Sequence, residues 1–305
     1  MKLRREQRGH HFYERSSGIH LLLEEAPVEP EYCDLGPELL SIALLNPCDL
    51  KCPFCYAPKS NHRLNAEFVF DVCKQFSVLG TLEVAFGGGE PTLYPGLGEL
   101  CRRIWTETDL GISLTTHGHH LTRALLDELV AHVSIIRVSI DAPEPIYSQL
   151  RGRSLADLLP KLSQAAERLP LGVNTVVNRT TLPLLDDLAK IVRDLGAVDW
   201  LLLPETKSGA FTHTESEWEA LDRWISGHCE QMPLRIAAEA VDFLTGPFPL
   251  AHEPDDYAHI RADRTLCRCS YAGDGILLTG QPMKDALRAL DRIGPHKLNP
   301  LCGLV

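Results

Sequence analysis

Short apolar segments alternate with longer amphipathic segments through the middle of this chain. The apolar segments are rich in Val, Ile and Leu and apolar on both faces, which is typical of strands that helices cover on a parallel sheet. They predict six strands, over residues 40–45, 82–86, 111–116, 135–140, 172–177 and 198–203.

The segments between these strands have helical periodicity, and several begin with a helix-start signal. Pro95, Thr122, Ser154 and the pair Thr214 and Glu217 each stand just before or within the first turn of such a segment. Strands that alternate with helices predict a parallel sheet with right-handed crossovers. The predicted helices cover residues 65–78, 96–108, 121–131, 154–168, 184–194 and 214–228.

Six strand–helix units predict an α/β domain over residues 40–228, with too few strands for a closed eight-stranded barrel. An N-terminal extension, 1–39, precedes it, with an extra edge strand at 20–24. A C-terminal cap, 229–305, follows it, with one helix at 282–292 and a place over the open side of the barrel. Reactive groups of parallel α/β folds gather at the carboxyl ends of strands. The residues at or just after such ends are Cys48, Gly88, Glu90, His117, Asp141, Asn178 and Glu205.

Three cysteines follow the first predicted strand with the spacing C-x3-C-x2-C. Cys48, Cys52 and Cys55 lie in the run NPCDLKCPFCYAP. Three thiolates on one short loop hold three corners of a cubane iron–sulfur cluster and leave the fourth iron open for chemistry. A structural zinc site would need a fourth ligand, and the nearest further Cys or His is His62, outside the loop.

A glycine-rich turn follows the second predicted strand. Gly88, Gly89, Glu90 and Pro91 come after the apolar run LEVAF, and consecutive glycines let a backbone approach a ligand closely. With the cysteine loop one strand–helix unit earlier, the chain resembles the radical S-adenosylmethionine (radical SAM) superfamily.

The resemblance implies an open (β/α)6 TIM-like partial barrel and two cofactors. Cys48, Cys52 and Cys55 would ligate a [4Fe-4S] cluster, whose open iron binds the amine and carboxylate of S-adenosylmethionine. Reductive cleavage of that cofactor gives a 5′-deoxyadenosyl radical, which removes hydrogen from a substrate C–H bond. The resemblance also implies an external electron donor such as a flavodoxin or ferredoxin.

Matching motifs also imply the residues that hold S-adenosylmethionine. The backbone of Phe54 is expected to meet the adenine, and Gly88, Gly89 and Glu90 are expected to hold the methionyl ammonium group. Ser139 and Asp141, in VSIDA, resemble a Ser-x-Asp element near the ribose and carboxylate. Arg151, in LRGRS, resembles an Arg that pairs with the carboxylate. Alternatively, Ser139 satisfies backbone groups and Arg151 is a surface charge.

A histidine follows the third predicted strand, in TTHGHH. His117 occupies a position from which it would donate to the substrate or act as an acid or base. The alternative is a loop histidine beside two solvent-exposed ones, His119 and His120.

Later strand ends supply further polar candidates. Strand alternation points Asn174 into the barrel, where it would touch ribose or substrate. Glu205 and Lys207 follow the sixth strand and would meet a polar substrate, or else form a charged pair in a solvated loop.

The other cysteines fall into two groups. Those within helices or at a helix end are expected to be buried as small apolar residues: Cys73, Cys101 and Cys229. The rest would hold a second cluster or return a hydrogen atom to a substrate radical: Cys33, Cys267, Cys269 and Cys302.

Composition narrows the class of protein. The chain has 305 residues, 44% hydrophobic and 23% charged, enough for a large core, and no apolar run long enough to span a bilayer. The basic N-terminus lacks the apolar stretch of a secretory signal, so a reducing cytosol is expected. A net charge of −11 argues against extended nucleic-acid binding.

Three functions remain open from the sequence. The element LRGRS and the C-terminal cysteines favour modification of a ribosomally made peptide, by cross-linking or by inversion of a stereocentre. The compact chain, without an evident peptide-recognition domain, favours a small molecule such as an amino acid, nucleotide or sugar. A structural iron–sulfur or zinc protein is the non-enzymatic alternative, and it would not need the Glu90 carboxylate.

Overall fold

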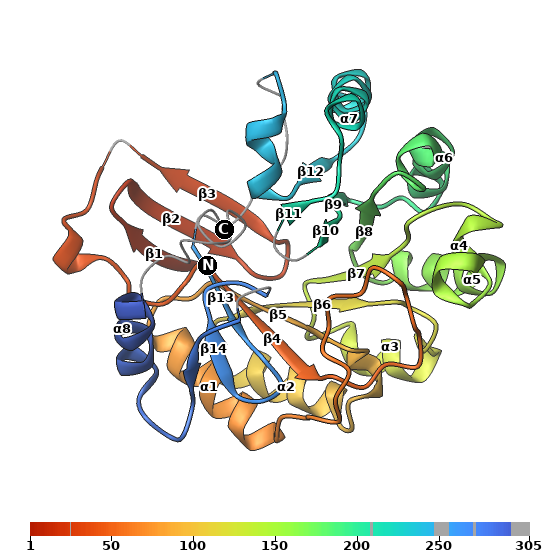
Figure 1. The fold of residues 1–305 in the computed structure, drawn as a ribbon. Helices are drawn as coiled ribbons and strands as arrows, with labels where there is room; N and C mark the ends of the chain where they lie inside the picture. The colour runs from red at the N-terminus through yellow and green to blue at the C-terminus, as the bar shows by residue number, and fades with distance from the viewer. Residues whose placement is uncertain (25, 208–209, 247–255, 271–272, 294–305) are drawn as a thin grey trace.

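The computed structural model describes residues 1–24, 26–207, 210–246, 256–270 and 273–293. Their main feature is one twisted sheet in the order β12-β9-β8-β7-β6-β5-β4-β13-β14-β15 (Figure 1). The strands are β4 (Leu39–Leu45), β5 (Glu83–Gly88), β6 (Gly111–Thr116), β7 (Ile135–Ser139), β8 (Leu171–Val177), β9 (Asp199–Pro204), β12 (Leu234–Ile236), β13 (Tyr257–Ile260), β14 (Thr265–Cys267) and β15 (Ile276–Leu277). The six predicted strands are confirmed as β4 to β9, and all pair in parallel.

Helices connect these strands, and the predicted ones begin and end within two residues of expectation. Thr122 caps α3 by accepting a hydrogen bond from the Leu125 N–H, and Thr214 with Glu217 forms a capping box on α7. The helices are α1 (Ala66–Val78), α2 (Leu97–Glu107), α3 (Arg123–Leu129), α4 (Ile146–Arg151), α5 (Leu155–Ala166), α6 (Leu185–Asp194), α7 (Glu215–His228) and α8 (Met283–Ile293). Short helix α4 was not predicted.

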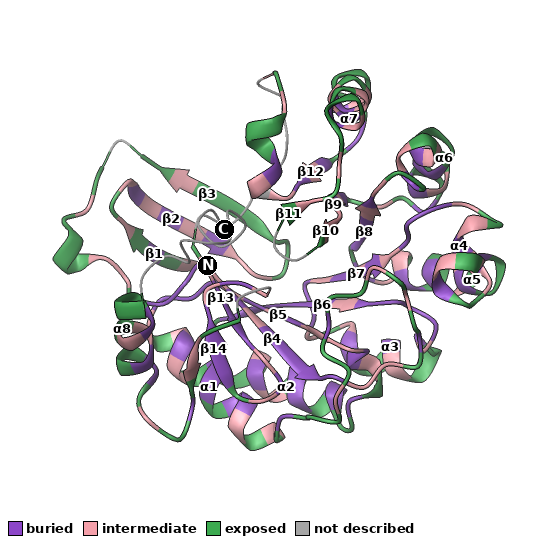
Figure 2. Cartoon of the chain, in the orientation of Figure 1, coloured by how far each residue is buried: buried purple, intermediate pink, exposed green. Residues whose placement is uncertain are grey.

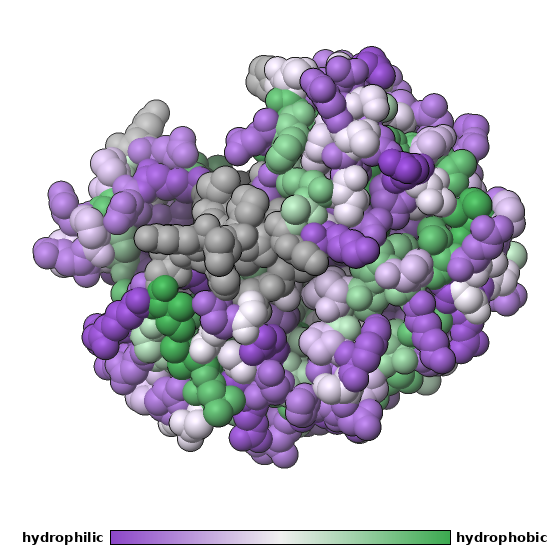
Figure 3. Space-filling view, in the orientation of Figure 1, coloured by the Kyte–Doolittle hydropathy of each residue, from purple (hydrophilic) through white to green (hydrophobic). Residues whose placement is uncertain are grey.

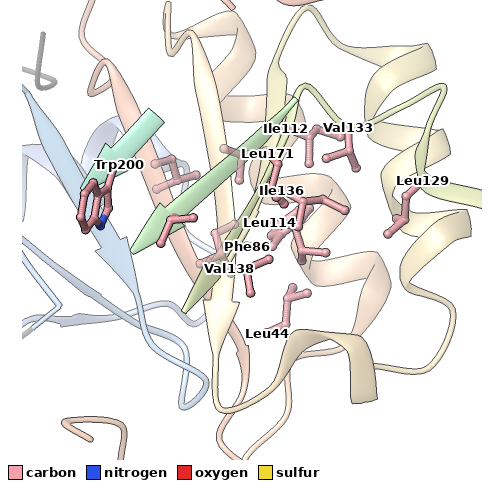
Figure 4. Close-up of a cluster of buried hydrophobic side chains, with 14 of the residues drawn as sticks. Leu44, Phe86, Ile112, Leu114, Leu129, Val133, Ile136, Val138, Leu171 and Trp200 are labelled. Carbon is pink, nitrogen blue, oxygen red and sulfur yellow. The ribbon is translucent and has the colours of Figure 1, made fainter. Parts of the chain in front are cut away.

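The core lies between the sheet and its helices. Alternate residues of the central strands, such as Ile112, Leu114, Ile136 and Val138, are fully buried in one apolar cluster (Figure 4). Figure 2 shows the same layering, with buried positions along the strands and exposed positions on the outer helix faces. The expectation that the strands are apolar on both faces is wrong, because the opposite face of the sheet carries Ser113, Arg137, Ser139 and Asn174.

The N-terminal segment forms a separate antiparallel sheet of β1 (Lys2–Glu6), β2 (Gly9–Glu14) and β3 (Ile19–Leu23), drawn in red and orange in Figure 1. The predicted edge strand exists as β3 but pairs with β2 rather than with the barrel strands. The sheet packs at the N-terminal ends of the barrel strands. Tyr13 donates to Glu83 at the start of β5 (2.7 Å), and a side chain at Gly111 would collide with the Tyr13 oxygen.

The C-terminal region extends both edges of the main sheet. β12 pairs in parallel with β9 at one edge, and β13 pairs in parallel with β4 at the other. No pairing joins these two edges among the described residues, so the barrel is open. β10 (Thr206–Lys207) and β11 (Ala210–Phe211) form a small hairpin after β9. The boundary proposed at residue 229 is still a prediction, and residues 294–305 of the predicted cap lie outside the described part.

The outer surface in the orientation of Figure 3 is mostly hydrophilic, with apolar groups in smaller areas. Among the described residues, no helix is long and apolar enough to cross a membrane.

Candidate functional site

The cysteine loop leaves the C-terminal end of β4. Cys48, Cys52 and Cys55 are all free thiols, with Cys48 and Cys52 partly buried and Cys55 exposed. Burial raises the pKa of both the Cys48 and the Cys52 thiol above its usual range. A metal binds the thiolate, so metal binding here would release the protons of these thiols. What suits the loop to a metal centre is its three free thiols at short separations.

The glycine turn at the end of β5 packs directly on the start of the cysteine loop. The Gly89 N–H donates to the Leu45 carbonyl (2.6 Å) and the Glu90 N–H to the Pro47 carbonyl (2.9 Å). A Cβ at Gly89 would lie 2.1 Å from the Pro47 oxygen, and Gly88 has φ +116°, which favours glycine. Glycine at these two positions therefore permits the close approach of the two loops.

Glu90 lies in the contact between the glycine turn and the cysteine loop, and it is only 1% exposed. Its carboxylate accepts hydrogen bonds from the Thr92 N–H (3.0 Å), the Thr116 hydroxyl (2.6 Å) and the His117 N–H (2.9 Å). Glu90 therefore joins the glycine turn to the end of β6. That it also binds the methionyl ammonium group remains a prediction.

Asp49, within the cysteine loop, connects that loop to two others. The His117 Nδ1 accepts the His119 N–H (3.1 Å), which leaves the Nε2–H to donate to Asp49 Oδ1 (2.9 Å). Asp49 Oδ2 accepts from His120 (3.1 Å) and Arg153 (2.9 Å). Burial alone would raise the pKa of Asp49, but the hydrogen bond from His117 holds it at about 2. Both His117 nitrogens are thus occupied, which favours a positioning role over the predicted acid or base role.

His119 differs from expectation, because it is buried rather than solvent-exposed. Its Nε2 shares a 2.9 Å hydrogen bond with the Tyr147 hydroxyl of α4. Burial lowers the pKa of His119 to about 4, so the ring is neutral at pH 7. His120 is partly exposed at the rim.

Arg151 is buried, so the alternative that it is a surface charge is wrong. Its Nε–H donates to Asp141 Oδ2 (2.6 Å), and the guanidinium lies 5.5 Å from the ring centroid of Phe54. Burial would lower the pKa of Arg151, but the Asp141 charge raises it above its ordinary value. Asp141 Oδ1 accepts the Val176 N–H (3.0 Å). Asp141 therefore orients Arg151 beside the cysteine loop, and a ribose contact for Asp141 remains a prediction.

Asn174 of β8 lies beside Ser139 of β7 in the register of the sheet. Its Oδ1 is buried and accepts no hydrogen bond from the described residues. A buried acceptor without a donor costs free energy, so the position suits a ligand hydroxyl or N–H. Ser139 and Asn174 were both predicted to approach the ribose, and the structure brings them together.

Glu205 follows β9, as predicted, and its Oε2 accepts a hydrogen bond from the Asn178 side chain (2.8 Å). Lys207 is exposed in β10. That Glu205 meets the substrate, as a catalytic residue would, remains a prediction.

Among the described residues, two of the cysteines proposed for a second cluster lie together. Cys267 and Cys269 are buried together against Tyr257, and Cys33 is partly buried beside the Val28 and Glu29 carbonyls. No group of three converging metal-binding side chains includes any of these cysteines within the described residues. Cys302 lies outside the described part.

Sequence reasoning missed Asp49, Thr116 and Arg153. Asp49 stands between two predicted ligands, but its partners come from loops far along the chain. Thr116 is the last residue of a predicted strand, and this position at the carboxyl end could have marked it as a candidate.

Comparison with known families decides the class. A family model of the radical SAM superfamily matches residues 42–195, half of the chain. The chain belongs to this superfamily. The matched segment runs from β4 to the end of α6 and contains the cysteine loop, the glycine turn, Arg151 and Asn174.

Two groups of relatives illustrate the range of the superfamily. The chain is 34% identical over 173 residues to a PqqA peptide cyclase of Rhodopseudomonas palustris, a match covering 53% of this chain and 45% of that protein. It is 28% identical over 206 residues to an S-adenosylmethionine-dependent nucleotide dehydratase of Lacinutrix mariniflava, covering 57% and 41%. The alignments thus span less than half the length of these relatives.

Solved structures share the fold at low identity. SuiB of Streptococcus suis bound to its precursor peptide SuiA has a TM-score of 0.75 at 12% identity, covering 94% of this chain and 86% of that chain. The structure described as native anSMEcpe with bound AdoMet and Cp18Cys peptide has a TM-score of 0.62 at 18% identity, covering 88% and 84%. These likenesses establish the open α/β partial barrel.

The superfamily uses a [4Fe-4S] cluster and S-adenosylmethionine, and the residues here fit both. Three free thiols on one loop suit the cluster, and the fourth corner receives no protein thiol from that loop. Two features leave room and a partner for a bound cofactor. A Cβ at Gly87, at the end of β5, would meet open space, and the Asn174 oxygen is an unsatisfied acceptor.

Proposed function

We propose that this enzyme modifies a ribosomally made peptide, by forming a cross-link or inverting a stereocentre. The observation that carries the proposal is the cysteine loop seated on the Gly88–Glu90 turn in a chain of the radical SAM superfamily. The PqqA peptide cyclase relatives and the fold shared with SuiB support a peptide as the substrate class.

The residues of this chain would position and shield the reacting groups. When bound, the cluster and S-adenosylmethionine supply a one-electron cleavage that yields a 5′-deoxyadenosyl radical. Cys48, Cys52 and Cys55 would hold the cluster, and Asp49 would fix their loop against the loop after β6. Arg151, oriented by Asp141, offers forked donors to a carboxylate. Asn174 offers its buried oxygen to a hydroxyl.

The proposal includes an electron donor such as a flavodoxin or ferredoxin and a working site in the reducing cytosol. The nine described cysteines are all free, which agrees with such a compartment.

A nucleotide is the second candidate substrate. The matches to S-adenosylmethionine-dependent nucleotide dehydratases and to a GTP 3′,8-cyclase favour it. A neutral, buried His119 and the Arg151 guanidinium beside Phe54 provide a polar and aromatic surface that would suit a base and phosphate.

Anaerobic reconstitution tests the cofactor assignment. About four irons per chain are expected, together with release of 5′-deoxyadenosine from S-adenosylmethionine under dithionite. Replacing Cys48, Cys52 and Cys55 together by Ala is expected to remove both, whereas Cys101→Ala, at a buried position of helix α2, is expected to retain them. Stoichiometric zinc without iron–sulfur absorption would overturn the assignment and favour a metal bound by Cys48, Asp49 and His117, whose donor atoms lie within 4.8 Å of one another.

Co-expression with a peptide encoded by a short neighbouring open reading frame tests the substrate class. A cross-link is expected to remove two hydrogens from the peptide mass. Inversion of a stereocentre leaves the mass unchanged in water and incorporates one deuterium in D2O. An unmodified peptide, with nucleotide-dependent 5′-deoxyadenosine release by the same preparation, would establish the nucleotide alternative instead.

A further inference from the structure

Two imidazoles and a carboxylate converge at the N-terminal ends of the barrel strands, away from the cysteine loop. His11 lies on β2, His20 on β3, and Glu38 immediately precedes β4. One nitrogen of each histidine and a Glu38 oxygen all lie within 4.8 Å of one another. His11 Nε2 and His20 Nδ1 are 2.9 Å apart, and His20 Nδ1 is 3.9 Å from Glu38 Oε1.

Each imidazole presents its other nitrogen to a further carboxylate. His11 Nδ1 is 3.2 Å from Glu6 Oε1, and His20 Nε2 is 3.9 Å from Glu83 Oε2. Metal-bound histidines nearly always donate their second N–H to a carboxylate, carbonyl or water, which fixes the ring and raises its basicity. His11 has that arrangement, whereas the 3.9 Å between His20 and Glu83 is an ion-pair contact that a small rotation of either side chain would shorten to a hydrogen bond.

The donor set and its spacing suit zinc. Zinc in proteins binds imidazole nitrogen and carboxylate oxygen at about 2.0–2.2 Å in a tetrahedron, which places donor atoms roughly 3.3 Å apart. The observed 2.9 and 3.9 Å lie on either side of that spacing. Small side-chain rotations of His20 and Glu38 would equalise them.

The exposed fractions of the three side chains also suit a metal site, with two ligands buried and one accessible to solvent. The side chains of His11 and Glu38 are 1% and 3% exposed, so a buried carboxylate faces two imidazoles at close range. The side chain of His20 is 28% exposed, so a metal ion would reach the site from solvent.

We propose that His11, His20 and Glu38 form a zinc site that fastens the N-terminal sheet to the barrel. Its ligands come from β2, β3 and the start of β4, so one ion would connect the two sheets. The site is separate from the cluster, because Glu38 and the cysteine loop flank opposite ends of β4, whose seven residues span about 23 Å.

Metal analysis and X-ray absorption on the untagged, iron-loaded full-length protein test this proposal. After equilibration with zinc and dialysis, about one zinc per chain is expected in addition to the iron. The zinc edge is expected to show only nitrogen and oxygen neighbours near 2.0–2.1 Å, without the sulfur shell near 2.3 Å that zinc on cysteines would give. No retained zinc, or a sulfur shell, would overturn the proposal.

Variants assign the zinc to these residues. His20→Ala and the shape-conserving Glu38→Gln are each expected to weaken zinc binding by about ten-fold or more. His10→Ala is the matched control, since His10 neighbours His11 on β2 and points to the opposite face of the sheet. Zinc is expected to raise the unfolding temperature of the wild type and the His10 variant only. Unchanged zinc affinity in the His20 and Glu38 variants would refute the assignment.

Discussion

Two polar side chains near the mouth of the barrel, the buried Glu90 and the half-buried Asn174, differ in whether the protein satisfies their hydrogen-bonding groups. The Glu90 carboxylate accepts hydrogen bonds from Thr92, Thr116 and His117, and it therefore contributes to folding of the site as well as to any ligand contact. The Asn174 Oδ1 accepts none from the described residues. A group that is buried and unsatisfied destabilises the free protein and gains its partner when a ligand binds.

Asn174→Leu tests this difference. The substitution removes an unsatisfied buried acceptor at similar volume, so the free energy of unfolding of the cofactor-free protein is expected to stay the same or rise by about 1 kcal/mol. Affinity for S-adenosylmethionine is expected to fall by about ten-fold, the equivalent of one lost hydrogen bond. Urea denaturation and equilibrium binding measure the two effects.

Asn178→Leu is the control, because Asn178 Nδ2 donates to Glu205 and its Oδ1 accepts from Thr180. That variant is expected to lose stability. A loss of stability in Asn174→Leu with unchanged cofactor affinity would show that Asn174 is structural.

Residues whose role depends on local spacing could be predicted from the sequence. Cys48, Cys52, Cys55 and the glycine turn are recognisable because ligand loops and close turns need fixed residues at short separations. Asp49 was not recognisable, since its partners His117, His120 and Arg153 are brought to it only by the fold.

At the scale of the strands, one carboxylate connects β7, β9 and β12. Asp199, at the start of β9, pairs with Arg137 of β7 and with Arg235 of β12, the latter at 3.0 Å. Strand β8 lies between β7 and β9, and Gly172 leaves the space, since a Cβ there would lie 3.2 Å from Arg137 Cγ. These two ion pairs therefore connect three strands on one face of the sheet.

Asp199→Asn is expected to destabilise the fold by about 2–4 kcal/mol at pH 7, because two mostly buried arginines lose their counter-charge. Burial alone would raise the pKa of Asp199, but the charges of Arg137 and Arg235 lower it below its ordinary value. A lowered pKa contributes stability that is present above the unfolded value of about 3.9 and is lost as the pH falls through the folded value. Urea titrations of iron-free protein from pH 7 to pH 3 measure this.

The difference between wild type and Asp199→Asn is therefore expected to shrink at acid pH. Asp187→Asn, in an exposed pair with Lys190, is the control and is expected to change stability by less than about 1 kcal/mol. A difference that is the same at pH 7 and pH 3 would contradict the proposed origin of the stability.

The elements that the sequence predicted are those with a strong local signal. β4 to β9 are short segments rich in Val, Ile and Leu, and α7 begins with the Thr214–Glu217 capping box. β1 and β2 were missed because charged and histidine residues alternate along them, and their polar side packs on the barrel. β13 was missed because it is defined by pairing with β4, more than two hundred residues earlier in the chain.

At the scale of the molecule, the two ends of the barrel carry different features. The C-terminal strand ends carry the cysteine loop, the glycine turn and Arg151, as parallel α/β folds require. The N-terminal ends are covered by the three-stranded sheet, through Tyr13 and Glu83, and carry the proposed zinc site. Substitutions in the three-stranded N-terminal sheet are therefore expected to lower the stability of the protein more than its catalytic activity.

The C-terminal helix belongs to the outer layer of the molecule rather than to the barrel mouth. Helix α8 lies beside α1 (Figure 1), and the Met283 N–H donates to Gln75 of α1 (2.9 Å). Met283, Ala286 and Leu290 form its buried side. Helix α8 of the predicted cap thus covers the flank of another helix, which changes what its removal should do.

Leu290→Asp is expected to lower the free energy of unfolding by about 3 kcal/mol, because it places a charge in the contact between α8 and the barrel's outer layer. Iron content and the ratio of product to 5′-deoxyadenosine are expected to match the wild type, since α8 is remote from the cysteine loop. Arg288→Ala, on the exposed side of α8, is the control for the helix itself.

Deletion of residues 281–305 is expected to behave like Leu290→Asp if α8 acts only by packing. The deletion variant could instead be as stable as Leu290→Asp and yet form 5′-deoxyadenosine without product. That result would show that residues 294–305, beyond α8, help to enclose the active site.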